Sequence, residues 1–267
     1  MDRRTFLKAG LGAAGYALSR KPALAGTKQR SFELEIIASS LEDAVAAHQG
    51  GATRIELAVH LEKGGISPSL DLAQTIVNAV PIAVRIMIRE REGFTLNGSE
   101  ELRSLAQKEE AFLQLPINGF VLGYVQGGRI DVQALRELIA AAPSAHYTVH
   151  NAIETTADSI ETLRTLRTFP QVDRALVCAC MNVEPGDQRS LTKRIERLKS
   201  YQEVWEQGDR RLLVNGLRVD ELKRVQREAG IREFHLSEQV NTPERSFPAG
   251  AVDADKVREV VALLSRP

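Results

Sequence analysis

The chain repeats one unit, a short apolar strand followed by a polar loop and an amphipathic helix, and this repetition restricts its fold more than any other feature. Most helical stretches end at a glycine or a proline, and several begin at a capping residue such as Ser40, Asp131 or Asp253. The pattern predicts strands over Glu33–Ala38, Arg54–Val59, Ile82–Arg89, Gly119–Val125, Ala145–His150, Arg174–Cys180, Arg211–Asn215 and Glu233–Ser237. It predicts helices over Ser40–Gln49, Leu70–Ala79, Glu100–Leu115, Val132–Ala142, Ala157–Thr168, Leu191–Gln207, Asp220–Ala229 and Asp253–Leu264.

Eight strand-helix units in about 240 residues match the size of an α/β protein of the (β/α)8 TIM-barrel class. A doubly wound open sheet has the same kind of units, so the count alone leaves both architectures open. The residues on the two faces of each strand distinguish the barrel from the open sheet. Side chains alternate along a strand, so Ile55 and Leu57 share an apolar face while Glu56 lies on the other. Glu35, Arg89, His150 and His235 fall on such polar faces too. Burying charged groups beneath a helix layer costs free energy, whereas the interior of a barrel that opens to water can hold them. The pattern therefore favours the barrel.

The N-terminus has the composition of an export signal. Arg3-Arg4 precedes a short apolar run from Ala9 to Leu18, and Ala23-x-Ala25 has the form of a cleavage site. The paired arginines resemble a twin-arginine (Tat) signal, which carries folded proteins. We expect residues 1–25 to be removed and residues 31–267 to form one barrel domain in the periplasm. An N-terminal anchor that stays attached is the alternative.

Charge argues against a polyanionic partner. The whole chain balances 35 basic against 35 acidic side chains; removing residues 1–25 leaves 30 against 34, a net charge of −4. We therefore expect no nucleic-acid partner and no membrane binding after signal removal. Cys178 and Cys180 are too few and too close together for a disulfide framework.

The inward-facing charged groups are the candidates for chemistry. Histidines at strand ends, with a carboxylate nearby, are suited to acid–base catalysis near neutral pH, and strand ends are where TIM barrels hold reacting groups. A structural ion network is the equally weighted alternative for the acids and the arginine, as is a hydrogen-bonded structural role for each histidine. The candidate catalytic residues are Glu35, Glu56, Arg89, His150 and His235.

No nucleophile elbow, Walker loop, Rossmann fingerprint or His-Glu-x-x-His segment occurs in the sequence, which excludes the commonest hydrolase, kinase, dehydrogenase and zinc-protease classes.

Several ordered motifs resemble the CutC family, named for a role in copper homeostasis. The match runs from about Phe32 to Ser237 and is carried by the motifs Leu34-Glu35-Ile36, Arg54-Ile55-Glu56-Leu57, Gly64-Gly65-Ile66-Ser67-Pro68-Ser69, Met87-Ile88-Arg89, His150-x-Ala152 and Glu233-Phe234-His235-x-Ser237. The resemblance implies a cytoplasmic TIM barrel, often oligomeric, with a polar mouth and a role in copper handling. It also implies that the five candidate residues occupy family motif positions.

The chain departs from the family pattern where a thiol is usual. Ile37 and Ala58 stand at the two cysteine positions, and neither can donate a lone pair to a metal. Asn151 and Glu154 replace a usual arginine and aspartate, and the turn at Asn215-Gly216-Leu217 is short for a phosphate cradle.

Cys178-Ala179-Cys180-Met181 is the one cluster of soft ligands. Alternate residues of a strand share a face, so Cys178 and Cys180 could approach one Cu(I) ion. Two small side chains filling a barrel layer are the alternative.

Three functions stay open. The leading hypothesis is a CutC-like copper homeostasis protein whose cofactor, if any, is copper. The alternative is a TIM-barrel enzyme that performs lyase- or isomerase-type proton transfer on a small anionic or sugar-like metabolite. A non-catalytic scaffold is the third. The expected partner is a small molecule or a metal ion, and assembly into a homo-oligomer is left open.

Overall fold

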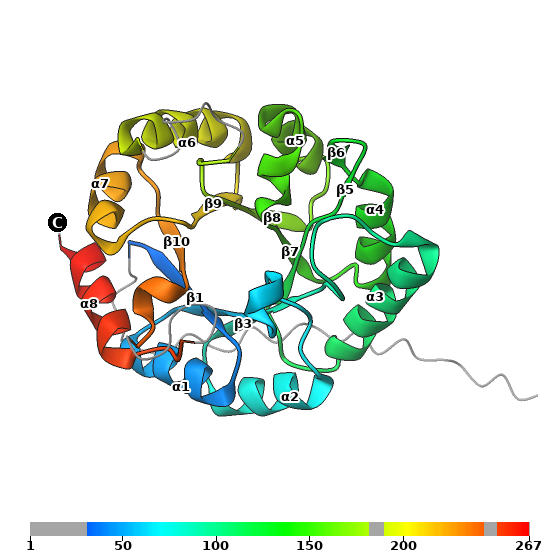
Figure 1. Ribbon diagram of the computed structural model, residues 1–267, viewed down its shortest axis with the longest axis horizontal. Helices are drawn as coiled ribbons and strands as arrows, with labels where there is room; N and C mark the ends of the chain where they lie inside the picture. The colour runs from blue at the N-terminus through cyan, green and yellow to red at the C-terminus, as the bar shows by residue number, and fades with distance from the viewer. Residues whose placement is uncertain (1–30, 182–189, 243–249, 267) are drawn as a thin grey trace, which may run out of the picture.

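The computed structural model describes residues 31–181, 190–242 and 250–266, and within them the strands close into a parallel barrel. The barrel strands are β1 (Glu33–Ala38), β2 (Arg54–Leu57), β3 (Ala83–Met87), β4 (Gly119–Leu122), β7 (His146–Val149), β8 (Val172–Val177), β9 (Arg211–Val214) and β10 (Glu233–Leu236). Neighbouring strands follow the chain order, and β10 pairs with β1 to close the ring (Figure 1). The predicted TIM barrel is confirmed.

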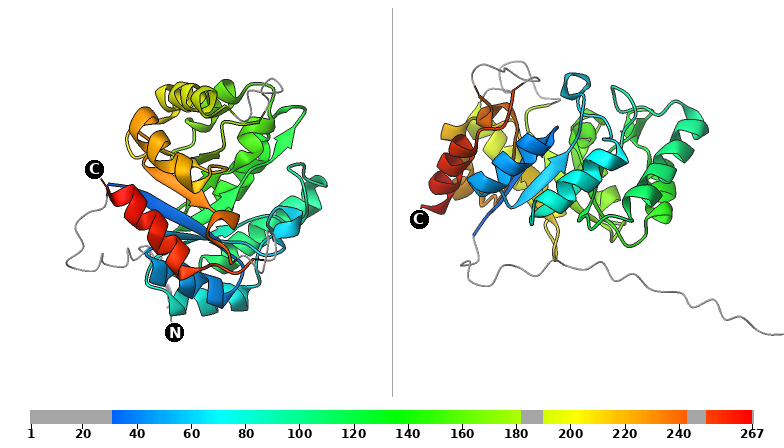
Figure 2. Two further views of the ribbon diagram at one scale, coloured as in Figure 1. Left: turned by 60° about the vertical axis from the view of Figure 1, so that its left-hand side comes forward. Right: turned by 90° about the horizontal axis from the view of Figure 1, so that it is seen from below.

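Helices form the outer layer. They are α1 (Leu41–Gly50), α2 (Leu70–Ala79), α3 (Gly98–Phe112), α4 (Val132–Ala141), α5 (Ser159–Leu166), α6 (Leu191–Trp205), α7 (Val219–Ala229) and α8 (Ala254–Ser265). The first and last helices, α1 and α8, lie side by side and complete the ring (Figures 1 and 2). Of the helices described, none combines the length and the apolar character that a membrane crossing would need.

Capping groups set the helix starts as predicted. Ser40 accepts a hydrogen bond from the Asp43 N–H, and Asp131 accepts one from the Ala134 N–H. Asp253 accepts from two backbone N–H groups at the start of α8. Each bond satisfies a donor that the first helical turn would otherwise leave unpaired.

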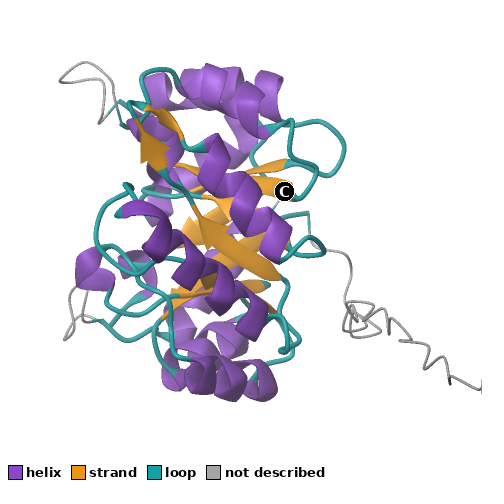
Figure 3. Cartoon of the chain, turned by 90° about the vertical axis from the view of Figure 1, so that its right-hand side faces the viewer, coloured by secondary structure: helices purple, strands orange, loops and turns teal. Residues whose placement is uncertain are grey.

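The main hydrophobic core lies between the strands and the helices. Helices surround the strands (Figure 3), and Ile36, Ile55 and Ile86 are fully buried members of this core. The opposite face of each strand points into the barrel, and there the side chains are mixed. A second, smaller apolar cluster contains Ala58 and Met87 inside the barrel near its C-terminal end. The alternation predicted from the sequence therefore separates an apolar outer face from a charged inner one.

Strand ends differ from the prediction. β2 ends at Leu57, β3 at Met87 and β7 at Val149, so Arg89 and His150 lie just beyond their strands. A two-stranded antiparallel pair, β5 (Val125–Gln126) with β6 (Arg129–Ile130), follows β4 and has no counterpart in the predicted elements. The short 3-10 helices η1 (Leu61–Lys63), η2 (Asn151–Thr155) and η4 (Glu238–Val240) follow β2, β7 and β10. The predicted signal at residues 1–25 lies outside the described residues.

Candidate functional site

A chain of ion pairs crosses the interior near the N-terminal ends of the strands. Its members are, in order, Glu35, Arg54, Glu233, Arg174, Asp173 and Arg85. Arg54 Nε lies 2.5 Å from Glu35 Oε2, and Arg85 Nη2 lies 2.7 Å from Asp173 Oδ2. Strand register brings these groups together, because Glu35 pairs with Arg54 across β1 and β2. Buried charges need such partners, so this chain forms the floor of the barrel.

Glu35 belongs to this floor. Its Oε2 accepts from Arg54, and its Oε1 lies 2.8 Å from Nδ1 of His235, its register partner on β10. Burial acts to raise the pKa of Glu35, but Arg54 and His235 outweigh burial and hold this pKa well below its usual value. Glu35 does not line the cavity above it. The structure therefore gives this predicted catalytic residue a supporting position.

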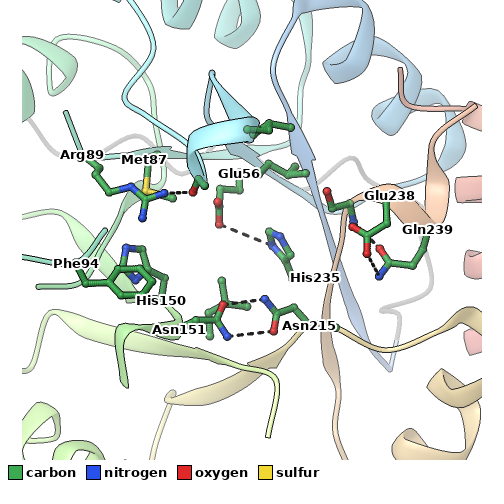
Figure 4. A pocket seen from close by; sticks show the side chains of 16 residues that line it. Glu56, Met87, Arg89, Phe94, His150, Asn151, Asn215, His235, Glu238 and Gln239 are labelled. Atoms are coloured by element: carbon green, nitrogen blue, oxygen red, sulfur yellow. Dashed lines mark hydrogen bonds and ion pairs between the residues drawn. The ribbon is translucent and has the colours of Figure 1, made fainter. Parts of the chain in front are cut away.

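A cavity of about 310 Å³ opens above the floor, at the C-terminal ends of the strands (Figure 4). Glu56, Arg89, His150 and His235 line it, so four of the five predicted residues converge there. They come from the ends of four different strands, which is the arrangement of TIM-barrel active sites. One part of the wall is apolar and includes Ile37, beside the buried Ala58; these are the two positions without the expected thiol.

Glu56 is the buried carboxyl group that lines the cavity. Its Oε2 is buried, makes no hydrogen bond to any residue that the structure describes, and lies 3.7 Å from His235 Nδ1. Burial raises the pKa of Glu56 to about 7, with the Glu35 carboxylate adding to the effect and His235 opposing it. The Glu56 and Glu35 carboxylates raise the pKa of His235 against the effect of burial. Glu56 therefore changes protonation state near neutral pH beside a cationic histidine.

His150 presents a neutral ring to the cavity. Burial, assisted by Arg89, lowers its pKa to about 3. The Ala152 N–H donates to Nδ1 at 3.3 Å, which places the ring proton on Nε2. That Nε2 is buried and has no hydrogen-bond partner among the described residues. Gly123 leaves room for the ring, because a Cβ there would lie 2.6 Å from Nδ1.

Arg89 holds the loop that follows β2. Its Nε donates to the Gly65 carbonyl oxygen at 2.7 Å, and its Nη2 donates to the Gly64 carbonyl oxygen. Both glycines have positive φ, 78° at Gly64 and 88° at Gly65, which explains why the turn needs glycine. Arg89 also lies over the Phe94 ring, 5.7 Å from its centroid. Phe94 also contacts His150, with ring centroids 5.0 Å apart.

Several groups of the mouth are absent from the residues predicted by the sequence. Ser237 lines the cavity with a buried hydroxyl that has no partner among the described residues. Its place in the motif around His235 was the available signal. Asn151 and Asn215 exchange amide hydrogen bonds of 3.3 and 2.9 Å across the mouth (Figure 4). Phe94 comes from an irregular loop and carries no periodic signal.

Among the residues that the structure describes, one cluster of two carboxylates and a histidine has donor atoms close enough to hold a metal. Atoms of Glu35, Glu56 and His235 lie within 4.8 Å of one another. Glu35 is already committed to Arg54, and the raised pKa of His235 favours its protonated form. Cu(I) prefers thiolate or thioether ligands, and the cavity offers only the thioether of Met87. The cluster therefore fits an ion-pair arrangement better than a copper site.

Cys178 and Cys180 are joined in a disulfide at the end of β8. Their Cα atoms are 5.2 Å apart, within the range that the bond requires. The sequence provides no reason to expect this single bond, because two cysteines are too few for a disulfide framework. A disulfide offers no thiolate, so the predicted soft-metal site stays a prediction for the reduced pair alone.

Comparisons with known proteins identify relatives across most of the chain. The CutC family model matches residues 32–240. A family protein CutC of Xylella fastidiosa (strain Temecula1) is 30% identical over 251 residues, covering 88% of this chain and 90% of that protein. The human copper homeostasis protein cutC homolog is 31% identical over 210 residues, covering 77% and 73% respectively.

Solved structures support the fold. The solved structure of a CutC protein from Streptococcus agalactiae superposes on this chain with a TM-score of 0.68 at 24% identity. The superposition covers 76% of this chain and 97% of that one. Phosphoribosyl anthranilate isomerase from Thermococcus kodakaraensis gives a TM-score of 0.58 at 13% identity, covering 88% and 100%. At these identities the two likenesses establish the barrel alone.

Proposed function

The chain belongs to the CutC family, and from the mouth of its barrel we propose that it is an enzyme that transfers a proton on a small polar metabolite. One observation carries the proposal. Three buried polar atoms have no hydrogen-bond partner in the described part of the chain and belong to residues that line the same cavity: Glu56 Oε2, His150 Nε2 and Ser237 Oγ.

Unpaired buried polar atoms are expensive, and three around one cavity point to a ligand. Leaving a buried donor or acceptor unsatisfied costs roughly 1–3 kcal/mol, which a purely structural cavity would not accumulate at three strand ends. Glu56, His150 and Ser237 come from β2, the end of β7 and the end of β10. A bound molecule that completes these hydrogen bonds would recover the cost.

Glu56 and His150 have complementary protonation states. A carboxyl group with a pKa of about 7 can both accept and return a proton near neutral pH. A neutral imidazole with its proton on Nε2 can donate a hydrogen bond to a carbonyl oxygen as negative charge develops on it. Glu56 would remove a proton from the carbon next to that carbonyl, leaving an enolate held by His150.

The enolate then has two outcomes. Where the deprotonated carbon carries a hydroxyl group, return of the Glu56 proton to the former carbonyl carbon, with the hydroxyl proton passing to the former carbonyl oxygen, gives an isomer. Where the next carbon along carries a leaving group, the enolate electrons form a carbon–carbon double bond to that carbon and the bond to the leaving group breaks. Glu56 then returns its proton to the departing group, which gives a lyase product. His235 orients the reacting carboxyl group, because its imidazolium lies between Glu56 and Glu35. Glu35 and Arg54 in turn fix His235 from below.

Solvent-exchange NMR tests this proposal even while the product is unidentified. Mature protein in D2O is incubated with panels of 2-oxo acids, 2-hydroxy acids and aldoses or ketoses, and loss of carbon-bound proton signals is followed. We expect exchange with at least one class, loss of exchange in Glu56→Gln and His150→Asn, and retention in the exposed-loop control His60→Asn. Absence of exchange in every class, or retention in both site variants, would contradict the proposal.

Copper handling is the second candidate, supported by family membership and by the position of Cys178. A Cβ on the cavity-lining Gly216 would lie 3.3 Å from Cys178 Cβ, so the cysteine pair adjoins the mouth. Reduction would release two thiolates, the ligand type that Cu(I) prefers. Reduced protein is equilibrated with Cu(I) and a competing chelator. Loss of metal retention in Cys178→Ser with Cys180→Ser supports this candidate, whereas no retention by the reduced wild type removes it.

We also infer export of the folded chain. The twin-arginine pattern at Arg3-Arg4 supports this inference, as does the Cys178–Cys180 disulfide, because disulfides persist in oxidising compartments. Fractionation of cells that express wild type and Arg3→Lys with Arg4→Lys tests it. A periplasmic mature form that depends on both arginines is expected, and equal distribution of the two proteins would refute export by this route.

A further inference from the structure

We propose that the ligand of the mouth is a small monocarboxylate with a short apolar side chain, whose carboxylate binds the guanidinium of Arg89. This inference rests on the proposed function of the same cavity and names the chemical class of its substrate.

Arg89 is a buried cation of the cavity wall with no carboxylate within ion-pair distance among the described residues. Burial lowers its pKa, and the carboxylates of Glu56 and Glu92 oppose this effect from farther away. The residue is 4% exposed, and within the described part of the chain its guanidinium forms no ion pair. Its two hydrogen-bond partners are the neutral carbonyls of Gly64 and Gly65. The buried guanidiniums of Arg54 and Arg85, by contrast, each bind a carboxylate, and that of Arg194 has all three nitrogens donating to backbone carbonyl oxygens. A buried charge is stable when paired, so the free partner position at Arg89 is suited to an anion.

The geometry leaves one face of the guanidinium available. Nε and Nη2 are bound to the glycine loop, whereas Nη1 makes no hydrogen bond within the described residues. In Figure 4 the guanidinium reaches the cavity from the same side as Phe94 and His150. Arg89 and His150 both pack on the Phe94 ring. A molecule held at this ring can place its carboxylate at Arg89 and its adjacent oxygen at His150 Nε2.

A phosphate group fits the mouth poorly. TIM barrels usually bind phosphate with the loops after the seventh and eighth strands. Here the Ser237 N–H after β10 already donates to Gln239 Oε1 at 2.9 Å, and the Glu238 side chain lines the same cavity with an opposing charge. Arg194, near the loop after β9, donates to the carbonyl oxygens of Cys178, Asn215 and Gly216.

One part of the wall is apolar and favours an aliphatic group, whereas Asn151, Asn215 and Ser237 line a polar part of the same cavity. Ile37, Leu61, Met87 and Leu176 form apolar parts of the lining, and they offer no hydrogen bonds to a ring of hydroxyl groups. A short aliphatic chain would bury its surface there. One charged head, one neighbouring oxygen and one apolar tail are the features of 2-oxo and 2-hydroxy carboxylates with an aliphatic side chain.

Three matched probes test the proposed class of ligand, and their binding to the mature protein is measured by calorimetry or saturation-transfer NMR. They are 4-methyl-2-oxopentanoate, its primary amide and 3-methylbutyl phosphate. A hydrogen-bonded charge contributes roughly 1.5–3 kcal/mol, so we expect the acid to bind about 10- to 100-fold more tightly than the amide, and the phosphate ester to bind most weakly. This comparison uses the wild-type chain and needs no variant that folds.

Variants locate the interaction. Arg89→Gln should remove the preference for acid over amide, and Arg89→Lys should retain part of it. His150→Asn should weaken both ligands and leave the preference unchanged. Tighter binding of the amide or the phosphate ester, or no binding of the acid, would overturn the inference. Preferential binding of the acid without deuterium exchange would support the ligand class and contradict the proposed proton transfer, so the two failures are distinguishable.

Discussion

Replacing Glu56 by glutamine should make the stability of the chain less dependent on pH. In the folded chain, burial raises the pKa of Glu56 from 4.5 to about 7. A raised folded-state pKa means that the contribution of this carboxyl group to stability is complete below pH 4.5 and is lost as pH rises through 7. The change from 4.5 to 7 corresponds to about 3 kcal/mol, most of it lost between pH 5 and pH 8.

His235 reinforces the effect. Its pKa is raised in the folded chain by Glu56 and Glu35, so its contribution is complete below its ordinary pKa of 6.5 and falls as pH rises above that value. The Glu56→Gln variant lacks one of these two carboxylates, so folding raises the pKa of His235 less than in wild type. The stability that His235 loses as pH rises is therefore smaller in the variant. Both groups therefore make wild type lose more stability than the variant between pH 5 and pH 8.

Urea unfolding at pH 5 and pH 8 measures the difference. We expect the free energy of unfolding of Glu56→Gln, relative to wild type, to increase by about 2–3 kcal/mol between the two pH values. Glu110→Gln, on the exposed face of α3, is the matched control and should run parallel to wild type. A constant difference between Glu56→Gln and wild type, or a change of opposite sign, would refute the assignment of Glu56 as a carboxyl group destabilised by burial.

The same geometry predicts the outcome of three other experiments. Arg54→Met breaks the ion pairs with Glu35 and Glu233, so the free energy of unfolding should fall by about 3–5 kcal/mol; a loss below about 1 kcal/mol in urea unfolding would contradict a buried network. Gly123→Ala places a methyl group against His150, and a displacement of this kind can lower an exchange rate about 100-fold, with a loss of stability of roughly 1–3 kcal/mol from the crowding; an unchanged rate would show that His150 is not held by this contact. The exchange rate of wild type should rise with pH and reach half its maximum near pH 7, because Glu56 must be ionised to accept a proton; a rate independent of pH between 5 and 8 would exclude Glu56 as the base.

Periodicity predicted the barrel and most of its polar interior. Side-chain alternation is a backbone property, so Glu56 and His235 could be assigned to the inner face before any contact was known. The turn glycines and capping residues fixed the element order, because their backbone requirements are local. The strand ends were less certain, and Arg89 and His150 proved to lie just beyond β3 and β7.

The sequence could not predict which charged residues form structural ion pairs and which have a shifted pKa in the cavity. Glu35 and Glu56 have the same parity, and only the position of the Arg54 guanidinium makes one an ion-pair partner and the other a group with a pKa near 7. Phe94 and Ser237 depend on loop paths, which no sequence period encodes. The disulfide between Cys178 and Cys180 depends on the turn at Ala179, whose φ of 54° is unusual for a residue other than glycine.

The protonation of Glu56 is the most direct test of the proposed proton-transfer site. Mature protein labelled with carboxyl-13C glutamate is titrated by NMR, and the Glu56 resonance is assigned by its absence from Glu56→Gln. We predict a midpoint near pH 7 for this resonance. A midpoint between pH 4 and 5, the range of an ordinary glutamate, would contradict the proposed role of Glu56.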